Sequence, residues 1–137
     1  MTFRKGATGK QIKMPNDAAA ILARFAAKRQ EHFIVLTLDG GHVVVQGHIV
    51  TIGLANRTQV HPREVFYPAI IDNAVGIIIA HNHPSDRTPS PSLEDDGVTQ
   101  RLVDAGDVLG IPVLDHIIVS QQGYFSYLER NILPVAK

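Results

Sequence analysis

A short apolar run that ends in two histidines constrains this chain more than any other feature. Residues 75–80 read Val-Gly-Ile-Ile-Ile-Ala, and His81 and His83 follow directly. A run rich in β-branched residues is typical of a strand buried on both faces, and ligands commonly bind where such strands end. Side chains two apart on an extended chain point the same way. His81 and His83 can therefore offer two imidazoles to one metal ion, while Asn82 faces elsewhere.

The segment after the histidines supplies a third ligand of the right kind. A loop that contains three prolines leads into Ser92-Leu93-Glu94-Asp95, which has the pattern of a first helical turn. Taken alone, Ser92 and Asp95 fit a capping box, and a single histidine is more often an ordinary surface or core residue than a ligand. In this order, two histidines and a carboxylate form the ligand set of a catalytic zinc site, with one position left for water. We predict a Zn²⁺ site formed by His81, His83 and Asp95.

The same stretch resembles the signature of the JAMM family, the MPN-plus metalloproteases: His-x-His-Pro, a spacer, then Ser-x-x-Asp. The sequence His-Asn-His-Pro-Ser at residues 81–85 resembles that of the RadC branch of the family. Similarity extends from about Pro15 to about Leu133 and includes the segments 60–66 and 114–118. One departure concerns the spacer at 84–91, which is one residue longer than usual. Loops absorb an extra residue at small cost.

The longer spacer leaves the third ligand open between Asp95 and Asp96. The resemblance implies a zinc-dependent hydrolase that cleaves peptide or isopeptide amide bonds with a metal-activated water. It also implies that Glu31, just ahead of a strand at 33–38, is the general base, and that the Ser92 hydroxyl helps to stabilise the oxyanion. Each assignment has a plainer alternative: Glu31 as a solvated residue at a helix end, and Ser92 as a helix cap.

Periodicity and turn residues predict the element order α-β-β-α-β-α-β-β. The expected helices are 15–28, 61–71 and 93–109, and the expected strands are 33–38, 42–52, 75–80, 113–119 and 124–127. This order implies a single mixed β-sheet flanked by helices, as in the α/β/α arrangement of the resembled family, which is related to the deaminases. We expect residues 1–14 to be a flexible N-terminal extension and residues 15–137 to form the domain.

Other polar residues compete for roles in the site. Asp115-His116 also matches the RadC pattern, and we interpret it as a buried pair within a strand rather than as direct metal ligands. His42 and His48 lie in or near the second strand, and no carboxylate is spaced along the sequence so as to form a site with them. We therefore expect both to be surface residues. Glu64 is the competing candidate for the general base.

Composition narrows the function further. The chain has 137 residues, 45% of them hydrophobic, which suits one domain with a real core. Thirteen basic residues balance thirteen acidic ones, so no net field favours nucleic acid. The chain has no Cys, so any zinc must be held by imidazole and oxygen. No apolar run reaches membrane-spanning length, and residues 1–14 lack the apolar core of a signal peptide, so we expect a cytoplasmic protein.

Three classes of function follow. The first is a zinc metallopeptidase with an unidentified peptide or protein substrate. A nucleobase deaminase would need Pro-Cys-x-x-Cys, which a chain without Cys cannot supply. The third is a non-catalytic DNA-repair accessory or protein-interaction module, as RadC proteins are traditionally described. The charge balance does not support that role, and we expect a short form without the helix-hairpin-helix segment of longer RadC proteins. Pairing of two copies at an exposed sheet edge, which would give a homodimer, stays open.

Overall fold

The apolar run forms β4 (Gly76–Asn82), which is buried along its whole length. It pairs antiparallel with β2 (His32–Leu38) and parallel with β5 (Val113–Ser120). A strand with a neighbour on each side and packing on both faces needs apolar side chains in both directions, which explains the continuous run. The structure is a computed structural model that describes residues 1–53, 60–84 and 88–137.

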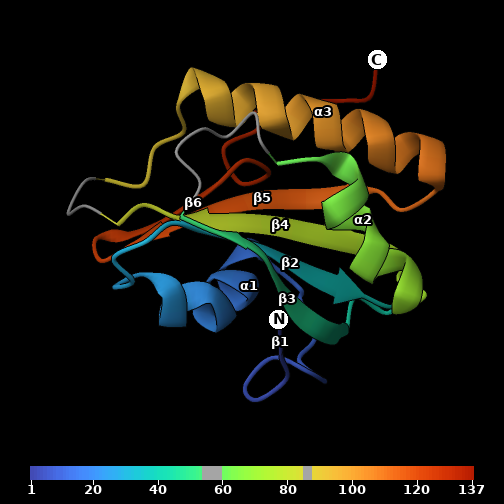
Figure 1. The fold of residues 1–137 in the computed structure, drawn as a ribbon, viewed down its shortest axis with the longest axis horizontal. Helices are drawn as coiled ribbons and strands as arrows, with labels where there is room; N and C mark the ends of the chain where they lie inside the picture. Colours follow the sequence, from blue (N-terminus) through green and yellow to red (C-terminus); the bar gives the residue numbers. More distant parts are fainter. Residues whose placement is uncertain (54–59, 85–87) are drawn as a thin grey trace.

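Within these ranges, six strands form one mixed sheet in the order β1-β3-β2-β4-β5-β6 (Figure 1). The other strands are β1 (Thr2–Phe3), β3 (Val44–Ile52) and β6 (Gly123–Ser126). The helices are α1 (Pro15–Leu22), the 3-10 helix η1 (Ala23–Phe25), α2 (Pro62–Ile71) and α3 (Leu93–Leu109). The predicted α/β class and single mixed sheet are therefore confirmed.

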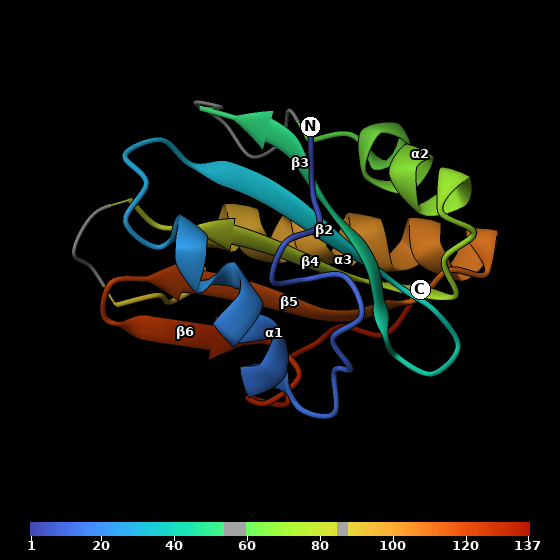
Figure 2. The same ribbon diagram turned by 90° about the horizontal axis from the view of Figure 1, so that it is seen from below.

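Helices cover both faces of this sheet. Figures 1 and 2 show α1 on one face and α2 with α3 on the other. The alternation of side chains along β2 divides the core accordingly: Ile34 and Leu36 pack with α1, whereas Phe33 and Val35 pack with α2 and α3. His81 belongs to the face of α2 and α3, because it lies opposite Phe33 in the pairing of β2 with β4.

Helix α3 connects the parallel strands β4 and β5. The carboxyl end of β4 and the amino end of α3 therefore lie at the same edge of the sheet. The helix begins after its N-cap Ser92 and ends at Gly110, whose φ of 72° lies in the left-handed region that favours glycine. The prediction of a helix at 93–109 is confirmed, and the polar motif that follows β4 lies at this edge.

Residues 1–14, which we expected to form a flexible or loosely docked extension, contact the sheet in part. Thr2–Phe3 pairs antiparallel with β3, Ala7 is buried, and the ring of Phe3 lies edge-on to that of Phe25. Phe3 and Ala7 are isolated apolar residues among lysines and glycines and form no periodic pattern. The local sequence therefore could not predict that this segment packs on the sheet. None of the described helices is long and apolar enough to cross a membrane.

Candidate metal centre

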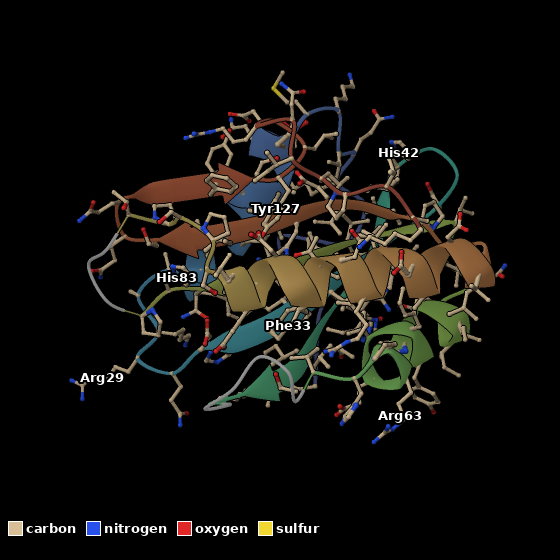
Figure 3. The ribbon with its side chains drawn as sticks, turned by 90° about the horizontal axis from the view of Figure 1, so that it is seen from above. Arg29, Phe33, His42, Arg63, His83 and Tyr127 are labelled. Carbon is tan, nitrogen blue, oxygen red and sulfur yellow. The ribbon has the colours of Figure 1, made fainter. Side chains whose placement is uncertain are left out.

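The two histidines converge because they leave the same face of β4. His81 Nε2 lies 3.2 Å from His83 Nε2, and the two rings are tilted with centroids 5.1 Å apart. His81 is fully buried and His83 is partly exposed. Figure 3 shows His83 at the amino-terminal end of α3. One imidazole therefore lies inside the protein and the other at its surface, next to the first turn of a helix.

Asp95 brings a carboxylate from that first turn. Its Oδ1 lies 3.4 Å from His81 Nε2, and its Oδ2 lies 3.7 Å from His83 Nε2. The capping box is also present: Asp95 N donates to Ser92 Oγ at 3.1 Å, and Ser92 N donates to Asp95 Oδ2 at 2.9 Å. Asp95 therefore caps the helix and faces the histidines at the same time.

The electrostatics of Asp95 follow from these contacts. Its carboxyl is only 1% exposed, and burial alone would raise its pKa. The neighbouring imidazoles of His81 and His83, together with the Ser92 N–H, outweigh this and hold the pKa of Asp95 well below its usual range. A carboxylate that stays ionised while buried is suited to binding a cation.

Asp96 points elsewhere, which bears on the alternative left open by the longer spacer. Its carboxylate accepts a hydrogen bond from the Tyr127 hydroxyl at 2.7 Å. Burial, and then this bond, raise the pKa of Tyr127 well above its ordinary value. Of the two neighbouring carboxylates, Asp95 is the one that lies beside the histidines. The spacer residues 85–87 lie outside the described residues.

Glu31 reaches the same place from β2. Phe33 lies opposite His81 in the antiparallel pairing, so a step of two residues outward along each strand brings Glu31 level with His83. Glu31 Oε1 lies 3.9 Å from His81 Nε2, and its side chain is 19% exposed. One donor atom from each of Glu31, His81 and His83 lies within 4.8 Å of the others, so these residues can hold a metal ion.

Two carboxylates thus flank one pair of histidines, and their settings differ. Asp95 is closer to His81, is almost completely buried and is fixed by the helix cap, whereas Glu31 is farther away and partly exposed. The first setting suits a fixed ligand and the second a group that exchanges protons with solvent. This agrees with the predicted roles, which remain predictions.

Comparison with known proteins identifies the family. A family model described as "RadC-like JAB domain" matches residues 12–132. The chain belongs to the RadC-like JAB domain family. Over 105 residues it is 46% identical to the UPF0758 protein of Pelobacter propionicus, an alignment that covers 77% of this chain and 45% of that protein. Over 123 residues it is 44% identical to the UPF0758 protein of Rubrobacter xylanophilus, covering 89% and 53% of the two chains.

A third relative gives the same picture. Over 105 residues the chain is 48% identical to the UPF0758 protein of Trichlorobacter lovleyi, covering 77% of this chain and 45% of that protein. This JAB domain therefore spans about half the length of these curated relatives. Their names state neither a ligand nor a substrate.

Asn82 lies between the two histidines and was given no role by the sequence. Its side chain faces the opposite side of β4, is fully buried and holds the segment that carries Glu31. Asn82 Oδ1 accepts from His32 N at 2.6 Å, and Asn82 Nδ2 donates to the carbonyls of Lys28 and Gln30 at 3.3 and 3.1 Å. The one strand β4 thus presents the histidines on one face and positions Glu31 from the other.

The pair Asp115-His116 lies in β5, the parallel neighbour of β4, and both side chains are buried as expected. Asp115 accepts from Ser126 Oγ at 2.5 Å and from Leu128 N at 3.0 Å. Burial raises the pKa of Asp115, and these bonds oppose the rise. His116 is in contact with His81, with 2.9 Å between His116 Nε2 and His81 Nδ1.

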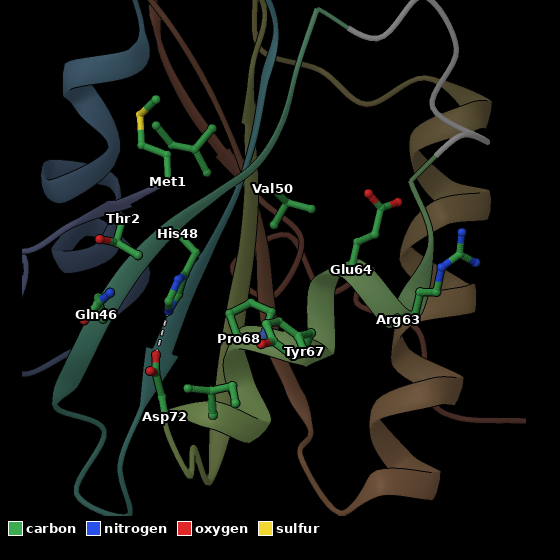
Figure 4. Close-up of a pocket in the computed structure, with 12 residues that line it drawn as sticks. Met1, Thr2, Gln46, His48, Val50, Arg63, Glu64, Tyr67, Pro68 and Asp72 are labelled. Atoms are coloured by element: carbon green, nitrogen blue, oxygen red, sulfur yellow. Dashed lines mark hydrogen bonds and ion pairs between the residues drawn. The ribbon is translucent and has the colours of Figure 1, made fainter.

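A separate hollow of about 850 Å³ lies between β3 and α2 (Figure 4). His48 lines it and was expected to be a surface residue, but that prediction is wrong: His48 is buried and contacts Asp72, with 2.6 Å between Nε2 and Oδ2. The pairing was hidden because Asp72 lies at the far end of α2. Thr37 also donates to Asp72 at 2.7 Å, so these groups satisfy one another. Glu64 lines the same hollow rather than joining the group of Glu31, His81 and His83.

Proposed function

We propose that this RadC-like JAB domain is a zinc-dependent hydrolase of peptide or isopeptide amide bonds. The observation that carries the proposal is the convergence of His81, His83 and Asp95, with Glu31 beside them. Two imidazoles and one buried carboxylate form a ligand set of catalytic zinc sites, and a second carboxylate nearby is what acid–base chemistry requires. Membership of the JAB family supports the same reading.

The spacing of the donor atoms fits zinc. Two ligands at the usual bond lengths of roughly 2.0–2.1 Å and at tetrahedral angles lie about 3.3 Å apart. His81 Nε2 lies 3.2 Å from His83 Nε2 and 3.4 Å from Asp95 Oδ1. Nitrogen and oxygen donors alone are sufficient for zinc, as a chain without Cys requires. When bound, the ion would supply Lewis acidity, activating water and polarising the amide carbonyl.

The remaining chemistry belongs to the chain itself. Glu31 would take the proton from the attacking water and pass it to the leaving amine, because its carboxylate is next to the histidines and partly open to solvent. The Ser92 oxygen already accepts a hydrogen bond from Asp95 N, so its own hydrogen can be donated to the oxyanion. Ser92 would then cap α3 and stabilise the transition state.

Metal-stripped and zinc-reloaded protein, screened against peptide and isopeptide libraries, tests this proposal. We expect cleavage only after reloading. Glu31→Gln keeps the size of the side chain but cannot take the proton, so the rate should fall by about 10²–10⁴ with zinc content unchanged. Glu64→Gln is the matched control, because Glu64 lies in the first turn of another helix, and it should leave the rate unchanged.

The same screen separates the hydrolase from an accessory module. Cleavage that proceeds equally in the stripped protein, or a fully active Glu31→Gln beside an inactive Glu64→Gln, would contradict the assignment of roles. Labelled DNA is included as a further probe. Tight, salt-sensitive DNA binding that survives chelation, without any amide cleavage, would favour a DNA-repair accessory role instead.

A further inference from the structure

A chain of hydrogen bonds runs inward from the buried histidine His81. Its Nδ1 lies 2.9 Å from His116 Nε2, and His116 Nδ1 lies 2.6 Å from the hydroxyl of Thr99. The Thr99 hydroxyl in turn lies 2.6 Å from the backbone carbonyl of Asp95. His81, His116 and Thr99 are all fully buried. The chain therefore starts and ends at two of the predicted metal ligands.

The last acceptor fixes the direction of the whole chain. A carbonyl can only accept, so the short contact between Thr99 and Asp95 requires the hydrogen of the Thr99 hydroxyl. With that hydrogen used, the contact between Thr99 and His116 requires a hydrogen on His116 Nδ1. The Tyr127 hydroxyl also contacts Thr99, but it donates its own hydrogen to Asp96, so it can only accept from Thr99 and the hydrogen on His116 Nδ1 is still required.

The direction then determines which nitrogen of each ring carries a hydrogen. A neutral imidazole has one N–H, so His116 with a hydrogen on Nδ1 presents a bare Nε2. That nitrogen can only accept, and it must accept from His81 Nδ1–H. A doubly protonated His116 is disfavoured, because a fully buried imidazolium would lose its hydration. His81 is thereby left with the lone pair on Nε2, the atom that faces His83 and Asp95.

We propose that His116 and Thr99 are positioning residues that set the tautomer of His81 so that its Nε2 can bind the metal. The opposite tautomer would place a hydrogen on Nε2, directed at Asp95 Oδ1 at 3.4 Å, and the shorter 2.9 Å contact with His116 opposes it. The ring of His116 is held flat against that of Tyr127, with an interplanar angle of 6° and centroids 4.9 Å apart. Outer partners of metal-binding histidines commonly contribute about 10–100-fold to metal affinity.

This inference rests on the proposed metal site, and its test uses metal binding and ring protonation rather than catalysis. Zinc affinity is measured by competition with a chromophoric chelator. His116→Phe keeps the ring but cannot accept, so zinc affinity should fall about 10–100-fold. His116→Gln can accept again through its amide oxygen at the position of Nε2, and affinity should return to within a few-fold of the parent chain. Thr99→Val should weaken zinc binding, whereas Thr37→Val, the same change in a buried threonine of β2 outside this chain of bonds, should not.

The second readout is the two-bond ¹⁵N–¹H correlation spectrum of the histidine rings in the metal-free protein. It is recorded at a pH of about 8.5, some two units above the ordinary histidine pKa. We expect a hydrogen on Nδ1 of both His81 and His116 and a bare Nε2 on His116. A hydrogen on His116 Nε2, or a His116→Phe variant that is folded and binds zinc as tightly as the parent chain, would overturn the proposal. A parent chain that binds no zinc but shows the expected ring protonation would refute the metal site and leave the hydrogen-bond chain standing.

Discussion

Replacing Asp95 and Asp96 by alanine, one at a time, should separate the metal ligand from its neighbour. Asp95 faces both histidines, whereas Asp96 accepts from Tyr127. Asp95→Ala should therefore remove most of the stabilisation that zinc confers, because zinc binds the folded chain only and one of its ligands is lost. Asp96→Ala should lower the stability of the metal-free protein and leave the zinc effect intact.

The magnitudes follow from linkage and from the size of the domain. Free zinc at 100 times the dissociation constant stabilises a folded protein by about 2.7 kcal/mol. For 137 residues the entropy of unfolding is about 290 cal/mol/K, so each kcal/mol moves the melting temperature by about 3 to 4 °C. The parent chain should thus gain about 9 °C. Asp95→Ala, if it weakens binding about 100-fold, should gain only about 0.4 kcal/mol, or about 1 °C.

Thermal unfolding followed by circular dichroism, with and without buffered zinc, is the assay. Loss of the Tyr127 hydrogen bond in Asp96→Ala should cost about 0.5–1.5 kcal/mol, so its metal-free melting temperature should fall by about 2 to 5 °C. Its gain with zinc should remain about 9 °C. If Asp96→Ala loses the zinc shift while Asp95→Ala keeps it, the placement of the third ligand in this site is refuted.

Two further predictions concern how the site is supported. Asn82→Ala removes the three hydrogen bonds by which this buried side chain holds the segment at the start of β2, so the free energy of unfolding in urea should fall by about 2 to 4 kcal/mol; a loss under 0.5 kcal/mol would contradict this role. Gly106→Ala should destabilise α3 by about 1–3 kcal/mol, because the added Cβ would lie 2.5 Å from the Ile111 carbonyl oxygen. Gly97→Ala in the same helix meets nothing within 4 Å and should be neutral or stabilising by up to about 1 kcal/mol, and equal losses for the two would refute the packing argument.

Local sequence was sufficient for the features that depend on local geometry. The spacing of His81 and His83 placed two imidazoles on one strand face, and the Ser92-x-x-Asp95 pattern marked a helix start; both follow from the repeat of a strand or a helix. The helix end at Gly110 is likewise local, because the left-handed conformation there favours glycine. The proposed metal ligand set could be assembled in advance because all three residues lie within one strand-loop-helix unit.

Features that depend on strand order could not be derived from any local pattern. Glu31 was placed by resemblance alone, and its nearness to His81 depends on β2 lying beside β4. The contact of His48 with Asp72 depends on how α2 packs across β3. The role of Asn82 was invisible for the same reason, since its partners lie about 50 residues earlier in the chain. Sequence periodicity indicates which face of a strand or helix a residue occupies, but not which residue of a neighbouring element lies opposite it.

Successive side chains at the end of β4 point to opposite faces of the sheet, and this alternation links the histidines to the segment that carries Glu31. His81 and His83 face Asp95, and Asn82, between them, holds the backbone next to Glu31 on the other side. His81 and Asn82 are the last two positions of the buried strand β4, and His83 follows directly, so two proposed metal ligands and the residue that holds the Glu31 segment are consecutive in the chain. A shift of β4 would carry the histidines and the Glu31 segment together, whereas Asp95 is fixed separately by the cap of α3. The distance from Glu31 to His81 is therefore set by the pairing of β2 with β4 and does not depend on the position of α3.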